Sequence, residues 1–491
     1  MPKLVFVALV FICLIQGCEK STVTAENEDL ALSRIPCRYH AHEHVSYQCY
    51  VARRQNGPKH NYYVSILSLK QVQNSEDASN EKANEALLAI PGGPGQGEQT
   101  KDAWIESWAD FLVKNAIPYD LIVFDPPGTI GSDSFWRCEK YEHAVLQLAA
   151  KNVSFREESE FLAPILDTCM DRYHEQLVAN NFSSEGVRGF SSRTYVERLA
   201  LLMGALEYEA YHLLATSYGT RVAMLLAGDP QVATLTLDSV YPFSRGTLLD
   251  TPALLETAER IHRRHYAEFI HDGSTYDEVM SAGLEELELR PQSWQLERWD
   301  GLGDVNFILN ASRLNDVAFS VLYDESMLEY FYAGLSNLKA RPDELRWVLE
   351  DFVTTTYDPA FSTLTFVATE CSDNRRVSFD ELLDEAEKHP KVQEDWQLIY
   401  QHDACAHPLF TEVNHLNEES YIDKPTLVFA GELDPVTPTF WVEELLSQLP
   451  QVQVLTVANV GHAVLGSERC KVSDLIHFWQ SRDEQVEVRC E

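Results

Sequence analysis

The sequence predicts an α/β fold in which helices cover both faces of a mostly parallel sheet and a mainly helical cap is inserted. Short apolar runs typical of buried strands alternate with helical stretches over residues 86–237 and again over 426–479. Between these parts, about 180 residues form acidic, aromatic-rich helical segments with almost no strand signal, which is close to the size of a domain. With 491 residues, 45% of them hydrophobic, the chain can build a large core and is not a disordered protein.

Two antiparallel strands are expected first, and the parallel sheet follows them. Residues 45–53 and 62–69 are strand-like and are joined by a turn-forming Gln-Asn-Gly-Pro segment at 55–58. The strands predicted for the parallel sheet are residues 86–90, 121–124, 211–215, 234–237, 426–430 and 452–457. The predicted helices are residues 102–115, 195–206, a helix from about residue 220, 440–449 and 472–479.

The N-terminal residues are predicted to lie outside the folded core. Residues 1–17 contain one lysine and an apolar run too short to span a bilayer, which is typical of a removed signal peptide. The ending Leu-Ile-Gln-Gly-Cys resembles a bacterial lipobox, which implies acylation of Cys18; ordinary cleavage near Gly17 and an uncleaved anchor are the alternatives. Residues 18–35 are polar and aperiodic, as a tether should be. We therefore expect an exported protein of the bacterial periplasm or cell envelope that meets the membrane only through an N-terminal lipid.

The rest of the chain is expected to form one interrupted core. Residues 36–242 make its first part, 243–422 the helical cap insertion and 423–491 its C-terminal part. The chain carries 76 Asp and Glu against 39 Lys and Arg, a formal charge of −37. A polyanion of this kind is repelled by nucleic acid, which excludes that class of partner. The acidic surface is interpreted as a solvated surface rather than as a device that steers substrates.

Cysteine usage favours the same compartment. Without Cys13 in the signal and Cys18 at its end, eight of the ten cysteines remain, and an exported chain favours their pairing into disulfides. Eight cysteines allow roughly 105 connectivities. The simplest one joins neighbours, Cys37 with Cys49, Cys138 with Cys169, Cys371 with Cys405 and Cys470 with Cys490. A zinc site is not expected, because the chain has no CxxC couple and its three alternating histidines, His40, His42 and His44, fit an exposed strand.

The strongest motif is Ala-Thr-Ser-Tyr-Gly-Thr at residues 215–220, between a predicted strand and a predicted helix. A nucleophile elbow needs small residues on both sides of its serine, because the backbone turns sharply there and lifts the hydroxyl above the sheet. Ala215 replaces the first glycine of this motif and still fits close packing. Taken alone, the motif also fits an ordinary turn in which Ser217 caps the helix.

Two later strands end in the partners that a nucleophilic serine requires. A serine needs a base, and the base needs an orienting carboxylate. Asp434 follows the strand Thr-Leu-Val-Phe-Ala, and His462 follows the next strand, so both are expected at the edge of the sheet that carries Ser217. The order Ser, Asp, His is that of α/β-hydrolases. Glu432 is the rival acid, but it lies too early in its turn.

A glycine-rich turn follows the first parallel strand. Acyl transfer passes through an oxyanion, which backbone N–H groups must meet at about 3 Å, and glycines let a loop come that close. The segment Pro-Gly-Gly-Pro-Gly at 91–95 stands in this position. We expect the N–H groups of Gly93 and Tyr218 to form the oxyanion hole.

Taken together, these motifs resemble a known family. GGPG at 92–95, TSYGT at 216–220, GELDPVTP at 431–438 and the Gly-His pair ending at His462 are similar to those of the α/β-hydrolase serine aminopeptidases, peptidase family S33, which includes proline iminopeptidase and tripeptidyl aminopeptidase. The resemblance runs from about residue 36 to the C-terminus, apart from most of the helical block. The chain departs from strict proline iminopeptidases at two positions, where Pro91 replaces a histidine and Pro127 replaces an arginine.

The C-terminal part resembles the tripeptidyl-aminopeptidase branch, which favours the disulfide couples given above. The family resemblance implies an aminopeptidase without cofactor or metal, which acts on peptides with a free N-terminus beneath a cap. Acidic side chains then hold the α-ammonium group, since a half-buried ammonium needs a paired carboxylate. The candidates are Glu370 and Asp373, near the return from cap to core, and Glu98, after the glycine-rich turn. Thr437 is expected either to brace Asp434 or to cap the following helix.

Two other functions stay open from the sequence. The same triad would serve an esterase or lipase that acts on carboxylic esters. A surface lipoprotein that kept the fold and binds without catalysis is the alternative from a different class. A binding protein has no need of the serine, the acid, the histidine and the glycine-rich turn together, which favours the enzyme.

Overall fold

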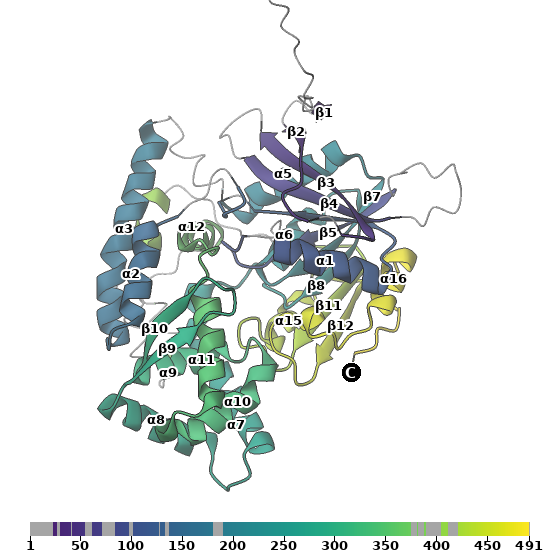
Figure 1. The fold of residues 1–491 in the computed structure, drawn as a ribbon. Helices are drawn as coiled ribbons and strands as arrows, with labels where there is room; N and C mark the ends of the chain where they lie inside the picture. The colour runs from purple at the N-terminus through teal and green to yellow at the C-terminus, as the bar shows by residue number, and fades with distance from the viewer. Residues whose placement is uncertain are drawn as a thin grey trace, which may run out of the picture.

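The computed structural model of the protein describes most of the chain, shown in Figure 1. The described residues are 23–26, 30–40, 42–54, 61–70, 84–97, 102–126, 128–132, 137–179, 190–374, 381, 387–388, 404–410 and 421–490. The predicted signal peptide, the lipidation residue Cys18 and the substrate candidate Glu98 lie outside the described residues.

One large sheet forms the core of the described chain. Its strand order is β1-β2-β3-β4-β6-β5-β7-β8-β11-β12. Strands β1 to β4 and the β4–β6 pair are antiparallel, and the pairs from β6 to β12 are parallel. The bounds are β1 Val23–Glu26, β2 Leu30–Ile35, β3 Val45–Arg54, β4 Asn61–Leu69, β5 Glu85–Ile90, β6 Asp120–Phe124, β7 Ala210–Thr216, β8 Val232–Asp238, β11 Thr426–Gly431 and β12 Val452–Val457. The predicted α/β class and the predicted leading hairpin are confirmed.

Helices cover both faces of this sheet (Figure 1). Strand β5 is buried on both of its faces. Leu88 packs among side chains of α5, α6 and α15 on one face, and its neighbour Leu87 packs among those of α1 and α16 on the other. Successive strand residues point to opposite faces, so a strand buried on both faces needs apolar residues at every position. The covering helices are α1 Asp102–Asn115, α5 Ser192–Leu206, α6 Tyr218–Leu226, α15 Thr439–Leu445 and α16 Val472–Ser481.

The predicted tether of residues 18–35 is wrong where the chain forms strands β1 and β2. Residues 30–35 form β2, which pairs antiparallel with β3, and Leu30 and Leu32 are each only 1% exposed. An outer strand of a sheet needs apolar residues only at alternate positions. The polar Ser33 and Arg34 therefore made a strand look like a tether.

Replacing Leu32 by alanine tests this placement of β2. The buried side chain leaves a cavity, which is expected to lower the free energy of unfolding by about 2 to 5 kcal/mol. Urea unfolding followed by tryptophan fluorescence would show a lower midpoint. The exposed Arg34→Ala variant of the same strand is the control, and it should leave the midpoint almost unchanged. A Leu32→Ala protein as stable as the wild type would place residues 30–35 outside the folded core.

A second body, the cap, lies beside the sheet (Figure 1). Its own hydrophobic core is built by side chains from α7 to α11 and the β9–β10 hairpin. The prediction that strands nearly vanish between residues 243 and 422 is wrong at this hairpin. The elements are α7 Thr247–Phe269, α8 Tyr276–Leu289, β9 Gln292–Glu297, β10 Asp304–Leu309, α9 Ala311–Ser320, α10 Leu328–Ser336, α11 Asp343–Thr356 and α12 Thr363–Asp373.

Two helices that the sequence analysis did not predict lie within residues 36–242, the predicted first core part, and pack against the cap instead. They are α2 Glu139–Ala149 and α3 Phe155–Ala179 (Figure 1). The buried Arg313 of α9 donates to the carbonyl oxygens of Leu148 at 2.6 Å and Ala149 at 3.0 Å, at the end of α2. The cap therefore contains two separate segments of the chain, and the predicted boundary at residue 242 separates parts that pack together.

The structure joins all four predicted cysteine couples. The Cα atoms are 5.2 Å apart in Cys37–Cys49, 5.8 Å in Cys138–Cys169, 5.1 Å in Cys371–Cys405 and 3.9 Å in Cys470–Cys490. Four disulfides are compatible with an extracellular protein. None of the described helices combines the length and the apolar character needed to cross a membrane.

Candidate active site

Ser217 lies at the sharp turn between β7 and α6. Its φ is +55° and its ψ is −127°, a conformation that non-glycine residues rarely adopt. The turn is held because Ser217 N–H donates to the carbonyl of Asp238 and Thr220 N–H donates to the carbonyl of Ser217, both at 2.9 Å. A Cβ on Gly219 would lie 2.4 Å from the carbonyl oxygen of Ile90, so only glycine fits there. This is the geometry expected of a nucleophile elbow.

Asp434 and His462 meet at the same edge of the sheet. Asp434 follows β11, His462 follows β12, and His462 Nδ1 lies 2.9 Å from Asp434 Oδ2. A buried carboxylate at this distance holds Nδ1 as the protonated ring nitrogen and leaves Nε2 as the base. The rival acid Glu432 is engaged elsewhere, in an ion pair of 2.8 Å with Arg264.

The turn after Asp434 supplies further donors. Thr437 Oγ1 donates to Asp434 Oδ2 at 2.6 Å, and the N–H groups of Val436 and Thr437 donate to Asp434 Oδ1 at 2.8 and 2.9 Å. Hydrogen bonds to both oxygens therefore hold the Asp434 carboxylate in one orientation. The structure agrees with the first of the two roles expected for Thr437, that of bracing the acid.

Asp434 and His462 each stabilise the charged form of the other. Burial alone would raise the pKa of Asp434, but the His462 ring and the Thr437 donors outweigh it and lower this pKa to about 2. Burial alone would lower the pKa of His462, but the Asp434 carboxylate outweighs that effect, and the pKa lies above its ordinary value of 6.5. A stabilised imidazolium is what a general base needs when it takes the proton of a serine hydroxyl.

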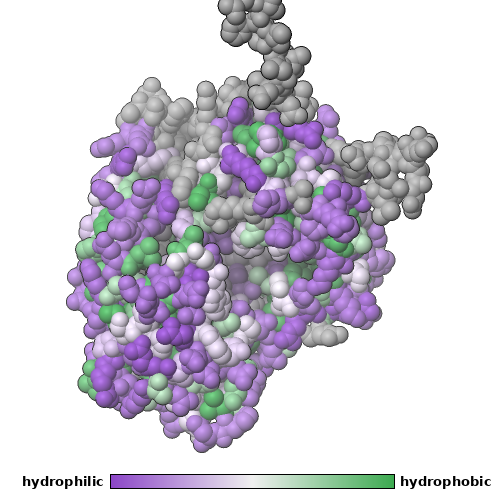
Figure 2. All heavy atoms as spheres, in the orientation of Figure 1, coloured by the Kyte–Doolittle hydropathy of each residue, from purple (hydrophilic) through white to green (hydrophobic). Residues whose placement is uncertain are grey.

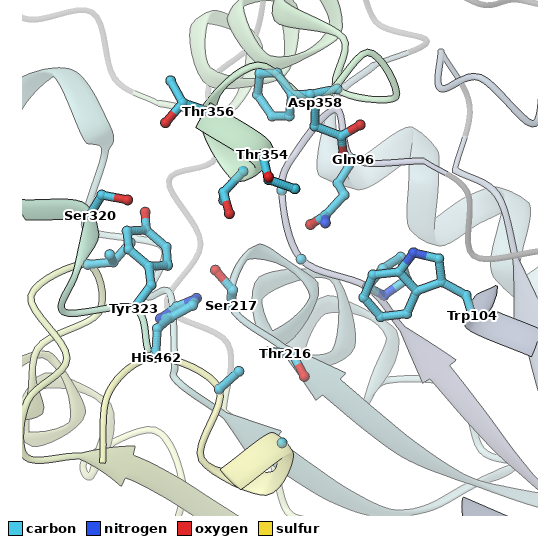
Figure 3. A pocket seen from close by; sticks show the side chains of 18 of the residues that line it. Gln96, Trp104, Thr216, Ser217, Ser320, Tyr323, Thr354, Thr356, Asp358 and His462 are labelled. Atoms are coloured by element: carbon cyan, nitrogen blue, oxygen red, sulfur yellow. The ribbon is translucent and has the colours of Figure 1, made fainter. Parts of the chain in front are cut away.

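A large cleft between cap and core opens at Ser217 and His462. Figure 2 shows that this face of the molecule is hollowed where the two bodies meet. Ser217 and His462 line the cleft from the core, and Tyr323 lines it from the cap. Figure 3 shows the Ser217 hydroxyl and the His462 ring turned toward one another within this cleft. The Tyr323 ring stands edge-on to the imidazole, with the ring centres 5.4 Å apart.

The glycine-rich turn lies against the elbow. A Cβ on Gly92 would be 3.1 Å from Ser217 Cβ, which shows how closely the backbone of this turn approaches the serine. Gly93 has a φ of +114°, which favours glycine. Within the described residues, no hydrogen-bond acceptor is recorded for the N–H groups of Gly93 and Tyr218. The two expected oxyanion donors therefore lie on the glycine-rich turn, for Gly93, and at the first residue of α6, for Tyr218.

The two described amine-binding candidates have different surroundings. Glu370 on α12 lines the cleft, is 3% exposed and accepts hydrogen bonds from Tyr241 Oη at 3.0 Å and Asn374 Nδ2 at 3.0 Å. Asp373, one turn further along α12, does not line the cleft. It accepts from Ser192 N–H at 2.8 Å and from the Ser192 hydroxyl.

The expectation that Asp373 binds substrate is therefore corrected. Asp373 is 1% exposed and lies 3.8 Å from the buried guanidinium of Arg221. Ser192, which it holds, also shares a hydrogen bond of 2.7 Å with the Tyr218 hydroxyl. Asp373 thus supports the tyrosine whose backbone N–H is a proposed oxyanion donor. The two carboxylates are three residues apart on one helix, so their spacing alone did not separate them.

The sequence analysis missed the cleft residues that the cap and the loop after β8 contribute. Tyr241 holds the Glu370 carboxylate, and Tyr323 covers His462. Tyr241 lies three residues after the carboxyl end of β8, just as the predicted acid and base follow the carboxyl ends of β11 and β12. This position is the one sequence signal that would have indicated Tyr241 as a cleft residue. Tyr323 follows a cap helix and has no comparable signal. Among the described residues, no group of histidine, cysteine and carboxylate side chains is arranged to hold a metal ion.

Comparison with known proteins matches both halves of the core. The family model described as alpha/beta hydrolase fold matches residues 85–270, and the model described as TAP-like protein matches residues 392–486. No curated protein matches the chain.

Solved structures resemble the chain only distantly. The enzyme MGS-M2 from a Medee basin deep-sea metagenome library is 13% identical, with 86% of this chain and 94% of that chain covered and a TM-score of 0.36. A proline iminopeptidase of Mycobacterium smegmatis is 13% identical, with 87% and 97% covered and a TM-score of 0.36. A laboratory-evolved potato epoxide hydrolase is 13% identical, with 86% and 96% covered and a TM-score of 0.34. Likeness at this level says nothing about the substrate.

Proposed function

Since the chain is an α/β-hydrolase-fold protein with a TAP-like C-terminal region, we propose that it is an exported serine aminopeptidase. The observation that carries the proposal is the meeting of Ser217 and the Asp434–His462 pair within a cleft with a buried carboxylate in its wall. The four disulfides support export. Acylation of Cys18 belongs to the same proposal.

The proposed reaction has two halves. Ser217 Oγ attacks the scissile carbonyl carbon while His462 Nε2 takes the hydroxyl proton, and the N–H groups of Gly93 and Tyr218 bind the resulting oxyanion. The C–N bond then breaks as His462 returns this proton to the leaving amine. A water molecule repeats the sequence on the acyl-enzyme and releases the N-terminal fragment with a new carboxyl group. No metal or organic cofactor takes part in this scheme.

The cleft wall supports a preference for a free N-terminus. Helix α12 begins against the glycine-rich turn, because Ser362 N–H donates to the carbonyl of Gly95 at 2.9 Å. Glu370 lies two turns further along this helix, so an ammonium beside Glu370 and a carbonyl beside Ser217 fit within one short peptide. A carboxylate in a half-buried wall stabilises an ammonium group strongly, and neither an ester nor a blocked peptide supplies one.

The variant Glu370→Gln tests the amine site. It keeps the shape and removes the charge, so kcat/KM for peptides with a free N-terminus should fall roughly 10- to 100-fold, the value of one hydrogen bond to a charged group. Their N-acetylated counterparts should not lose activity. The exposed Glu329→Gln variant of α10 is the matched control and should change neither rate. Equal losses on free and acetylated peptides would contradict the assignment of Glu370.

The alternatives give different results in the same assays. An esterase would hydrolyse p-nitrophenyl esters and show no preference for free over acetylated N-termini. A non-catalytic binder would form no adduct with a fluorophosphonate probe, whereas the proposed enzyme should be labelled at Ser217. Mass spectrometry of the labelled protein identifies the modified residue.

A further inference from the structure

The loop that carries His462 is bound by the end of β8. Val464 N–H donates to Asp238 Oδ1 and Leu465 N–H donates to Asp238 Oδ2, each at 2.9 Å. Asp238 is 1% exposed, so water cannot take the place of its carboxylate. Asparagine could not do the same, because its side chain offers one acceptor oxygen and would turn its NH₂ toward the second N–H group.

The neighbouring side chain completes this contact. Ser239 Oγ accepts the N–H of Ala463 at 2.9 Å, so the three residues that follow His462 are all held by two adjacent core residues. Ala463 has a φ of +65° and Ser239 a φ of +58°, both in the left-handed region. Such conformations cost free energy and persist where the surroundings dictate them. The direction of the His462 side chain is set by this backbone.

Asp238 also contacts the nucleophile elbow. Its carbonyl oxygen accepts Ser217 N–H at 2.9 Å, and it pairs with Thr216 of β7 on one side and with Phe429 of β11 on the other. The strand end that holds the histidine loop is thus the same one that holds the serine. One residue links the two loops whose relative position decides whether a proton passes from Ser217 to His462.

The charge of Asp238 acts on the imidazole as well. Among the described residues, the titratable groups that contact the His462 loop include Asp434 after β11, Asp238 on β8, and Tyr323 and Glu325 in the cap. Glu325 Oε2 accepts Gly461 N–H at 3.2 Å, and Glu432 Oε2, after β11, accepts Asn459 N–H at 3.4 Å. Burial raises the pKa of the Asp238 carboxyl to about 6, although the loop N–H groups and His462 oppose the rise. In turn, Asp238 adds to the effect of Asp434 in raising the pKa of His462.

We propose that Asp238 is a positioning residue, which orients His462 toward Ser217 by binding the histidine loop through its carboxylate and the nucleophile elbow through its backbone carbonyl. This inference rests on the proposed serine-hydrolase function. It assigns Asp238 no contact with the substrate: Asp434 remains the acid of the triad, and Asp238 acts through the geometry and the charge around the base.

Kinetics of the full-length Asp238→Asn variant test the proposal. A base displaced by a fraction of an ångström to one ångström should lower kcat about 10- to 100-fold while KM for a free peptide changes little. The acidic limb of the pH–kcat profile should move to lower pH, because a negative charge near His462 is lost. Ser239→Ala removes one hydrogen bond of the same loop and should lower kcat about 3- to 10-fold. Asp474→Asn is the matched control: Asp474 also accepts a backbone N–H, from Arg489 at 3.1 Å, but does not line the cleft.

Each outcome decides the proposal. A folded Asp238→Asn protein with the wild-type kcat and pH profile overturns it, and a loss equal to that of Asp474→Asn does the same, since a general loss of stability then suffices. If Asp238→Asn does not fold, Ser239→Ala decides, because an unchanged kcat overturns the proposal and a reduced kcat at unchanged KM supports it. Fluorophosphonate labelling of the wild-type protein is run in parallel. If Ser217 is not labelled, the proposed serine-hydrolase function is contradicted, and the positioning role of Asp238 is contradicted with it.

Discussion

Replacing Ser217 by alanine should lower kcat roughly 10⁴- to 10⁶-fold, because the acyl-enzyme can no longer form and only oxyanion binding and substrate positioning remain. The fold should persist. The bond from the residue 217 N–H to the carbonyl of Asp238 uses only backbone atoms and survives the substitution. Hydrolysis of a peptide with a free N-terminus, together with a thermal unfolding curve, measures both effects.

A surface serine provides the control for this variant. The Ser154 hydroxyl bonds the neighbouring Glu157 at an exposed turn, and Ser154→Ala should keep the full wild-type rate. If purified Ser217→Ala protein also kept that rate, the nucleophile would lie elsewhere and the elbow would be an ordinary strand-to-helix turn.

Replacing Asp434 by asparagine should lower kcat roughly 10³- to 10⁴-fold at neutral pH. The amide can turn its NH₂ toward His462 Nδ1, which would place the ring proton on Nε2, where it blocks the base. The 2.9 Å ion pair that stabilises the imidazolium is lost at the same time. Initial rates at saturating substrate measure the loss. Asp474→Asn again serves as the control, because the Asp474 carboxylate pairs with Arg489 and is not among the groups that line the cleft.

The pH dependence of the same variant has a definite sign. The base works only as a neutral imidazole, so wild-type activity should rise with pH through the pKa of His462, which lies above 6.5. Asp434, with a pKa of about 2, stays ionised throughout that range. Without its charge, burial lowers the pKa of His462, and the acidic limb of the Asp434→Asn profile should move to lower pH. An unmoved limb would show that Asp434 does not act on His462.

Local patterns identified the parts of the site that depend on local geometry. A nucleophile elbow is made by a few consecutive residues between one strand and one helix, and the motif around Ser217 contains all of them. Asp434 and His462 each follow an apolar strand directly, and parallel strands end at one edge of a sheet, so their meeting followed from strand order. The same reasoning placed Gly93 beside the serine.

Sequence patterns gave wrong or missing predictions where the structure of a segment depends on the elements that pack against it. Strand β2 shows only the alternation of an outer strand, and its polar half looked like a tether. The β9–β10 hairpin was missed for the same reason. Alternate residues are exposed in both of its strands, so neither strand forms a continuous apolar run between the surrounding helices. Helices α2 and α3 precede the rest of the cap by many residues, and nothing in their own sequence shows that Arg313 binds the end of α2.

The sequence by itself determined the α/β-hydrolase class and predicted the Ser, Asp and His of the proposed triad, because these depend on residues close together in the chain or on the order of the strands. For the cysteines it indicated only that neighbour pairing is the simplest connectivity, and the structure joins these couples. Only the tertiary structure decided that Glu370 faces the cleft while Asp373 faces Ser192, and that Asp238 holds the histidine loop. The sequence identifies a carboxylate but does not show which groups surround it in the folded protein. Whether it binds a ligand, a neighbour or a loop depends on the groups that folding brings within hydrogen-bond distance.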